Sequence, residues 1–142
     1  MKTSDITTLL RAKGFRATQG KIALIAALLD SPSPESIETL AGKIKGALDA
    51  ANVYRSLESF VAAGLVRRID LGNAKSYYEF AVDRKHHHHI VCTDCGRIED
   101  VKGCSEALDK TALKASTSFS AIQSHSLEFF GLCRPCTKKS VR

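Results

Sequence analysis

Apolar residues in the first half of the chain recur three and four positions apart, which is the spacing of one face of an α-helix. The pattern predicts four amphipathic helices before residue 64. Each presents an apolar stripe to a shared core and leaves its polar positions to solvent. The predicted core positions are Ile6, Leu9, Leu10, Ile22, Ile25, Ala26, Leu29, Ile37, Leu40, Ala41, Ile44, Val53, Leu57, Phe60 and Val61.

Capping residues predict where these helices begin and end. Thr18 and Asp49 are expected to cap the second and the fourth helix, because their side-chain oxygens can accept hydrogen bonds from the first backbone N–H groups. Ser33 is expected to cap the third helix, with Pro34 at its first position. Gly64 is expected to end the fourth helix.

A hairpin is predicted directly after the fourth helix. The segments Leu65–Leu71 and Lys75–Phe80 flank Gly72-Asn73, a dipeptide typical of a tight turn between antiparallel strands. Helices followed by a recognition-type helix and a hairpin are the order of a winged helix-turn-helix. Residues 1–81 are therefore expected to form an N-terminal winged-helix DNA-binding domain.

The pattern of residues 82–142 predicts a second, smaller α+β domain. We expect strands at His86–Cys92 and Arg97–Val101, a helix at Ser105–Ser116 and a longer strand at Phe119–Leu132. In that last strand, period-two alternation would place these residues on one face: Phe119, Ala121, Leu127 and Phe129. The fold class predicted for the whole chain is thus α+β, with two domains.

Composition narrows the class of protein. With 142 residues and 44% hydrophobic content the chain can form a core, and a net charge of +6 suits a polyanionic partner without specifying one. No apolar run approaches the roughly 18 residues of a membrane span, and no apolar signal segment follows Met1. We expect a cytosolic protein with no membrane association.

Four of the five cysteines form two pairs, Cys92-x-x-Cys95 and Cys133-x-x-Cys136. Two such knuckles supply the four thiolates of a tetrahedral zinc site, which is a closed, structural site. Paired or unligated cysteines are the simpler alternative. A thioredoxin-type redox pair is disfavoured, because no βαβ pattern surrounds either motif.

Four consecutive histidines precede the first knuckle. In an extended strand His86 and His88 point to one face and His87 and His89 to the other, so each pair could chelate a separate ion. His125 is predicted on the strand face of Leu127 and Phe129, as a core residue or a ligand. Imidazole with carboxylate suits exchangeable first-row ions such as Fe²⁺, Mn²⁺, Zn²⁺, Ni²⁺ or Co²⁺. The candidate carboxylates are Glu79, Glu99, Asp100 and Glu106.

Side chains off the buried stripe of the fourth helix are candidate DNA contacts. Small residues, Ala50 and Ala51, would allow the helix to enter the major groove, where Tyr54 and Arg55 could reach a base and a phosphate. Further candidate phosphate contacts are Arg11, Lys13, Arg16, Lys21, Arg67, Arg68 and Lys75. Each taken alone is equally compatible with an ordinary solvated charge.

In order and spacing, these motifs resemble the ferric uptake regulator family of bacterial metalloregulators over nearly the whole chain. The matching motifs are Asn52-Val53-Tyr54-Arg55-Ser56-Leu57, Ala63-Gly64-Leu65-Val66, Tyr78-Glu79-Phe80, His86–His89, Cys92-Thr93-Asp94-Cys95-Gly96, His125-Ser126-Leu127 and Gly131–Cys136. The resemblance implies a homodimeric repressor that binds palindromic operator DNA when loaded with metal. Its second domain would then be the dimerisation domain.

The resemblance also implies three metal sites. Structural zinc would be held by the four paired cysteines. The regulatory ion, Fe²⁺ first but also Mn²⁺ or Zn²⁺, would be held by Glu79, His87, His89 and Asp100. An additional site would use His86, His88, Glu106 and His125. DNA contacts would come from Arg16, Lys21, Ala51, Asn52, Tyr54 and Arg55.

The chain departs from the family pattern at the regulatory site. Many members supply a histidine from the loop before the third helix, and Ser31–Glu35 contains none. Asp100 stands where peroxide sensors often have Asp and iron sensors Glu, so a peroxide-sensing member is an alternative. Zinc sensors usually place an extra cysteine in the regulatory site, and the neighbourhood of Val82 has none. Cys104 could be a buried small residue, a ligand or a redox reporter.

Two other classes of protein compete with this interpretation. A zinc-dependent enzyme is disfavoured, because four cysteines closed on zinc leave no open position for water. A metal-storage or constitutive DNA-binding protein would use the same histidines without switching. Dependence of specific DNA affinity on metal separates these alternatives.

Overall fold

The computed structural model describes residues 1–72, 74–83, 85–104 and 106–140, in two compact units spanning residues 1–84 and 85–142. Our predicted domain division lies after residue 81. Each unit is described by itself below. Within the described residues, none of the helices combines the length and apolar character needed to cross a membrane.

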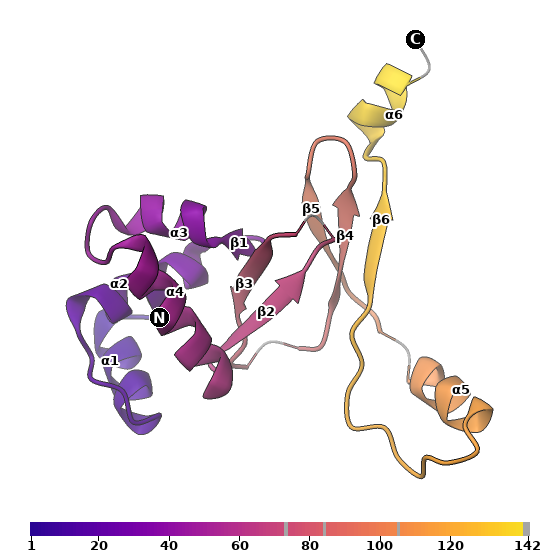
Figure 1. The fold of residues 1–142 in the computed structure, drawn as a ribbon, viewed down its shortest axis with the longest axis horizontal. Coiled ribbons are helices and arrows are strands. Elements are labelled where there is room, and N and C mark those ends of the chain that lie inside the picture. The colour runs from indigo at the N-terminus through magenta and orange to yellow at the C-terminus, as the bar shows by residue number, and fades with distance from the viewer. Residues whose placement is uncertain (73, 84, 105, 141–142) are drawn as a thin grey trace. The chain divides into compact units, whose positions relative to one another are not determined.

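The first unit contains the four predicted helices, which share one core (Figure 1). Their bounds are α1 Thr3–Ala12, α2 Gln19–Asp30, α3 Ile37–Ile44 and α4 Ala50–Ala62. Leu10, Leu24, Leu40, Val53 and Phe60 are fully buried in this core. The amphipathic pattern therefore identified the four helices, but it misplaced the packing face of α2. The buried apolar residues of that helix are Leu24, Ile25 and Leu28, whereas the predicted Ile22, Ala26 and Leu29 are only partly buried.

Two of the three predicted N-caps are confirmed. The Thr18 side chain accepts a hydrogen bond from the N–H of Lys21, and the Asp49 carboxylate accepts one from Asn52 at 2.8 Å. The prediction for α3 is wrong: its cap is Ser36, whose hydroxyl accepts a bond from the N–H of Thr39. Ser33 cannot cap a helix that begins four residues later, at Ile37, because Glu35 and Ser36 between them are extended.

That extended segment is β1, Glu35–Ser36, and it joins the predicted hairpin in a three-stranded sheet of order β1-β3-β2. The hairpin strands are β2, Val66–Asp70, and β3, Ser76–Phe80, paired antiparallel. The turn prediction at Asn73 lies outside the described residues. Helix α2 contacts β3 and α4 contacts β2, which seats the hairpin on the helical core (Figure 1).

The second unit is built on a sheet of order β5-β4-β6 (Figure 1). Its elements are β4 His88–Cys92, β5 Ile98–Val101, α5 Ala107–Ala115, β6 Glu128–Gly131 and α6 Arg134–Ser140. Strand β5 runs antiparallel to β4 and β6 runs parallel to it. The segment between β5 and β6, including α5, makes the crossover that a parallel pair requires.

The predicted long strand at Phe119–Leu132 is wrong over most of its length. Only Glu128–Gly131 forms a strand, and Phe119 is exposed. A strand is stabilised by its neighbour, and β4 offers pairing partners only to these four residues. No residue of helix α5 is buried. The short helix α6 was not predicted.

Candidate metal centres and nucleic-acid interface

Cys92, Cys95, Cys133 and Cys136 lie together at one end of the second sheet. Cys92 ends β4 and Cys133 follows β6, and the parallel register that pairs Cys92 with Gly131 brings the two knuckles together. All four sulfur atoms lie within 4.8 Å of one another, and Cys95 Sγ is 3.7 Å from Cys133 Sγ. A zinc tetrahedron with Zn–S bonds of about 2.3 Å has sulfur–sulfur edges of about 3.8 Å. The cluster therefore has the dimensions of a four-thiolate zinc site.

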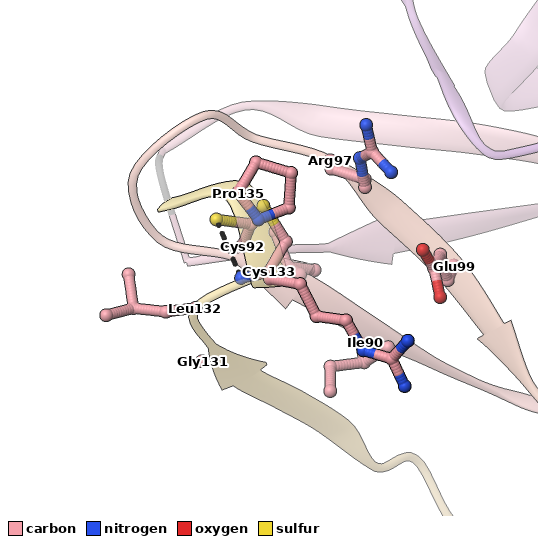
Figure 2. Close-up of a pocket in the computed structure, with 10 residues that line it drawn as sticks. Ile90, Cys92, Arg97, Glu99, Gly131, Leu132, Cys133 and Pro135 are labelled. Atoms are coloured by element: carbon pink, nitrogen blue, oxygen red, sulfur yellow. Dashed lines mark hydrogen bonds between the residues drawn. The ribbon is translucent and has the colours of Figure 1, made fainter. Parts of the chain in front are cut away.

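Backbone N–H groups that donate hydrogen bonds to sulfur stabilise negative charge in this cluster. The N–H of Cys133 donates to Cys92 Sγ at 3.4 Å, drawn as the dashed line in Figure 2. This bond, together with one from Cys95, lowers the pKa of the Cys92 thiol to about 6. The side chain of Cys133 and burial raise the pKa of Cys136, since neighbouring thiols share the available protons. A divalent cation would stabilise the four thiolates in their deprotonated form.

A 510 Å³ pocket adjoins the cysteine cluster. Figure 2 shows that Cys92, Cys133 and Pro135 form one end, with Arg97, Glu99 and Ile90 along the strands. The side chains of Ile90 and Leu132 are exposed, so the pocket opens on an apolar surface. The pocket is therefore an open depression beside the cysteine cluster rather than an enclosed catalytic cavity.

His86, His88 and His125 converge on one side of the histidine segment, as the alternation predicted for the first two. Their Nε2 atoms are 3.0–3.2 Å apart in all three pairings. Cys104 joins them, with Sγ 3.0 Å from His125 Nε2. Glu106, the expected carboxylate ligand, is exposed before α5 and is not part of this group.

Neighbouring groups orient two of these imidazoles. Asp109 on α5 contacts His125 Nδ1 at 2.7 Å, which leaves Nε2 directed at the cluster. The His88 ring bonds to the backbone of Leu127. Burial, followed by the positive charge that His86 and His125 can carry, lowers the pKa of His88 and favours its neutral, ligand-competent form.

His87 and His89 form the second histidine pair, with ring centroids 4.9 Å apart. His89 Nε2 lies 3.5 Å from Asp100 Oδ1, because His89 and Asp100 are register partners on β4 and β5. His87 Nδ1 is 2.9 Å from the Lys85 carbonyl, a contact that orients the ring. Two imidazoles and a carboxylate in this arrangement are suitable ligands for a first-row divalent ion.

Glu79, the fourth predicted regulatory ligand, belongs to β3 in the first unit. Its carboxylate pairs with Arg67 across the hairpin, at 3.3 Å from Arg67 Nη1. No local sequence pattern indicates this partner. A cation competing for Glu79 would have to displace this guanidinium or share the carboxylate with it.

The predicted DNA-contacting side chains of α4 are exposed, whereas Val53, Leu57 and Phe60 on the same helix are buried. Tyr54 is 49% exposed although it is a large aromatic residue. Arg16 is exposed, and Lys21 places its ammonium 5.4 Å from the centre of the Phe15 ring. Ala51, Asn52, Tyr54 and Arg55 are all exposed, as are Ala50, Ser59 and Ala62 on the same helix.

Comparison with known proteins decides the family. The model of the ferric uptake regulator family matches residues 12–130, which is most of the chain. The chain belongs to the ferric uptake regulator family. Ferric uptake regulation protein 2 of Mycolicibacterium fortuitum is 33% identical over 140 residues, covering 95% of this chain and 94% of its own. The peroxide operon regulator of Bacillus subtilis is 32% identical over 135 residues, covering 92% and 90%.

Solved structures support the same fold. The iron-containing ferric uptake regulator of Francisella tularensis superposes with a TM-score of 0.74 at 26% identity, over 87% of this chain and 96% of that one. Membership of the ferric uptake regulator family makes this chain a metal-responsive transcriptional regulator rather than an enzyme. The winged-helix and dimerisation-domain architecture expected from the sequence is that of the family.

Proposed function

We propose that this member of the ferric uptake regulator family represses transcription by binding palindromic operator DNA as a homodimer when a regulatory ion, Fe²⁺ first, is bound. The observation that carries the proposal is the division of metal-ligating residues by chemistry. The cysteine cluster suits a permanent zinc ion, whereas His87, His89 and Asp100 suit an exchangeable one.

The regulatory ligand set consists of Glu79, His87, His89 and Asp100. Glu79 comes from the winged-helix unit and the other three from the second unit. An ion shared by all four would restrict the arrangement of the units and so set the spacing of two recognition helices. Such an ion acts by binding the DNA-competent arrangement more tightly than the alternatives.

The homodimer is supported by apolar side chains on the second sheet. Ile90 on β4 and Phe129 on β6 are register neighbours, and both are exposed in the single chain. Phe130 and Leu132 are exposed as well, although alternation along β6 turns Phe130 to the face opposite Phe129. Exposed apolar side chains of this size are typical of a subunit interface.

The test is operator affinity measured by fluorescence anisotropy with and without Fe²⁺ under anaerobic conditions. We expect iron to raise affinity by roughly 5–150-fold, the range of a coupling of about 1–3 kcal/mol. The variant His87→Ala/His89→Ala is expected to lose this response and keep its structural zinc. Glu99→Gln, an exposed neighbour of Asp100, is the matched control and should respond as wild type does.

Equal metal response in wild type and in His87→Ala/His89→Ala would overturn the sensor role. Specific DNA binding that ignores metal would instead identify a constitutive DNA-binding protein, and metal uptake without specific DNA binding a storage protein. Both outcomes contradict the proposal.

Asp100 supports a peroxide-sensing alternative, as does similarity to the Bacillus subtilis peroxide operon regulator. Fe²⁺ reacts with peroxide and Mn²⁺ does so poorly, so the two ions separate the effectors. A peroxide sensor loaded with Fe²⁺ should release operator DNA on treatment with hydrogen peroxide, while the Mn²⁺ form retains it. An iron, manganese or zinc sensor would respond to its ion without this difference.

A further inference from the structure

Three imidazole nitrogens in the second unit face one another. His86 Nε2, His88 Nε2 and His125 Nε2 form a triangle with sides of 3.2, 3.0 and 3.1 Å. Metal–nitrogen bonds of about 2.0–2.1 Å give a tetrahedral edge of about 3.3–3.4 Å. A small outward shift of the three nitrogen atoms would therefore give one face of such a tetrahedron.

Hydrogen bonding outside the triangle determines what its nitrogens can do. With Nδ1–H of His125 donated to the Asp109 carboxylate, the Nε2 of that ring presents a lone pair. The His88 ring is likewise engaged by the backbone of Leu127. Lone pairs about 3 Å apart repel unless a proton or a cation lies between them. The carboxylate–histidine arrangement is the one that commonly supports a metal-ligating imidazole.

Cys104 supplies a fourth donor atom to this triangle. The half-buried thiol has Sγ 3.0 Å from His125 Nε2, and its sulfur and the three nitrogens all lie within 4.8 Å of one another. Gly103, at φ +95°, turns the chain after β5 in a conformation that other residues rarely adopt. After this turn Cys104 lies beside the histidines, whereas Glu106 directly precedes α5 and is exposed.

We infer that Cys104, not Glu106, is the fourth ligand of a closed His₃Cys site that selects zinc-class ions. Three neutral imidazoles and one thiolate leave a bound divalent ion with a net charge of +1. The soft thiolate favours Zn²⁺ or Co²⁺ and disfavours Mn²⁺, whose preferred ligands are oxygen atoms. The inference rests on the proposed metal-responsive function in one respect: it assumes that the regulatory site binds a different ion.

Cobalt spectroscopy tests the ligand directly. The full-length protein is first loaded with one equivalent of Zn²⁺ to fill the four-cysteine site and then titrated with Co²⁺. We expect wild type to show a near-ultraviolet sulfur-to-cobalt charge-transfer band and the visible absorption of tetrahedral cobalt. Cys104→Ser should lose the charge-transfer band, and Glu106→Gln, the matched control, should keep it.

Zinc affinity gives a second measurement. In competition with a chromophoric chelator, Cys104→Ser should weaken Zn²⁺ binding at this site by at least 10-fold and leave Mn²⁺ binding to the protein unchanged. Asp109→Asn should weaken Zn²⁺ binding by roughly 10–100-fold while the cobalt charge-transfer band remains, because Asp109 positions His125 without touching the ion. Retained zinc at the four cysteines verifies that each variant is folded.

Three outcomes would overturn the inference. One is a charge-transfer band that survives in Cys104→Ser, since the sulfur would then come from the four-cysteine site. Another is a band absent from wild type. The third is loss of binding in Glu106→Gln with Cys104→Ser unaffected, which would assign the carboxylate as ligand. None of these results alters the iron response of operator binding, so failure here is distinguishable from failure of the proposed function.

Discussion

Tyr78 and Glu58 form a polar pair inside the winged-helix unit. The Tyr78 hydroxyl donates to Glu58 at 2.9 Å, and Arg68 lies 3.3 Å from the same carboxylate. The tyrosine side chain is only 1% exposed. Burial, and then the bond to Glu58, raise the pKa of Tyr78 to about 12. The neutral phenol is therefore the form that the folded state stabilises.

A raised pKa in the folded state means that this stabilisation is complete below the unfolded pKa, about 10, and is lost as the pH rises to about 12. Tyr78→Phe should lower the free energy of unfolding by about 1–2 kcal/mol at pH 7. The difference from wild type should shrink between pH 10 and pH 12, measured by urea unfolding. Tyr54→Phe, which removes an exposed hydroxyl, is the control; a difference independent of pH would contradict the assignment.

Single residues show what the sequence could and could not predict about the site. The cysteine pairs and the alternating histidines were found because their chemistry depends on short spacings along the chain. For Cys104 the sequence left three alternatives: a buried small residue, a ligand or a redox reporter. Its place beside His125 depends on the turn at Gly103 and on the crossover to β6, which no local spacing encodes. The ion pair between Arg67 and Glu79 likewise depends on the register of the hairpin.

At the level of elements, local period and capping predicted the four N-terminal helices, because each buries a stripe in one core. Prediction failed where an element depends on a distant partner. Strand β1 exists because Glu35 and Ser36 pair with Tyr78 and Tyr77, and this pairing delays the start of α3. Strand β6 is short because β4 pairs with only four of its residues.

Packing of α2 gives a prediction at this scale. A Cβ on Gly20 would lie 2.6 Å from Leu48 Cγ and 2.9 Å from the Ala47 carbonyl oxygen. Gly20→Ala should therefore destabilise the protein by about 1–3 kcal/mol, although alanine favours helix. Gly42 in α3 has no neighbouring atom within 4 Å of such a Cβ, so Gly42→Ala should stabilise by about 0.5–1 kcal/mol.

Urea unfolding of the two alanine variants measures both effects on the same scale. Opposite signs are expected, since only the space around each glycine differs between two helical positions. Stabilisation by Gly20→Ala would show that α2 and the segment before α4 do not approach as closely as Leu48 and Ala47 do here.

The two units of the molecule are stabilised by different means. The first has a continuous core in which Leu24, Leu40, Leu57 and many others are buried. In the described part of residues 85–142, the buried apolar side chains are Val91, Cys92 and Cys136, two of which belong to the cysteine cluster. Burial of apolar area is therefore sufficient for the first unit, whereas the second needs its metal and its subunit interface.

Removal of zinc should consequently unfold one unit and spare the other. Structural zinc contributes apparent binding free energies of about 10–16 kcal/mol in small domains, far more than a three-residue core supplies. After treatment with a strong chelator, we expect amide hydrogen exchange in residues 85–140 to become fast while that of α1–α4 stays slow. Cys95→Ser/Cys133→Ser should reproduce this pattern without chelator, and Cys104→Ser should not. Equal loss of protection in both units would mean that the winged helix depends on the zinc-bearing unit, despite its own complete core.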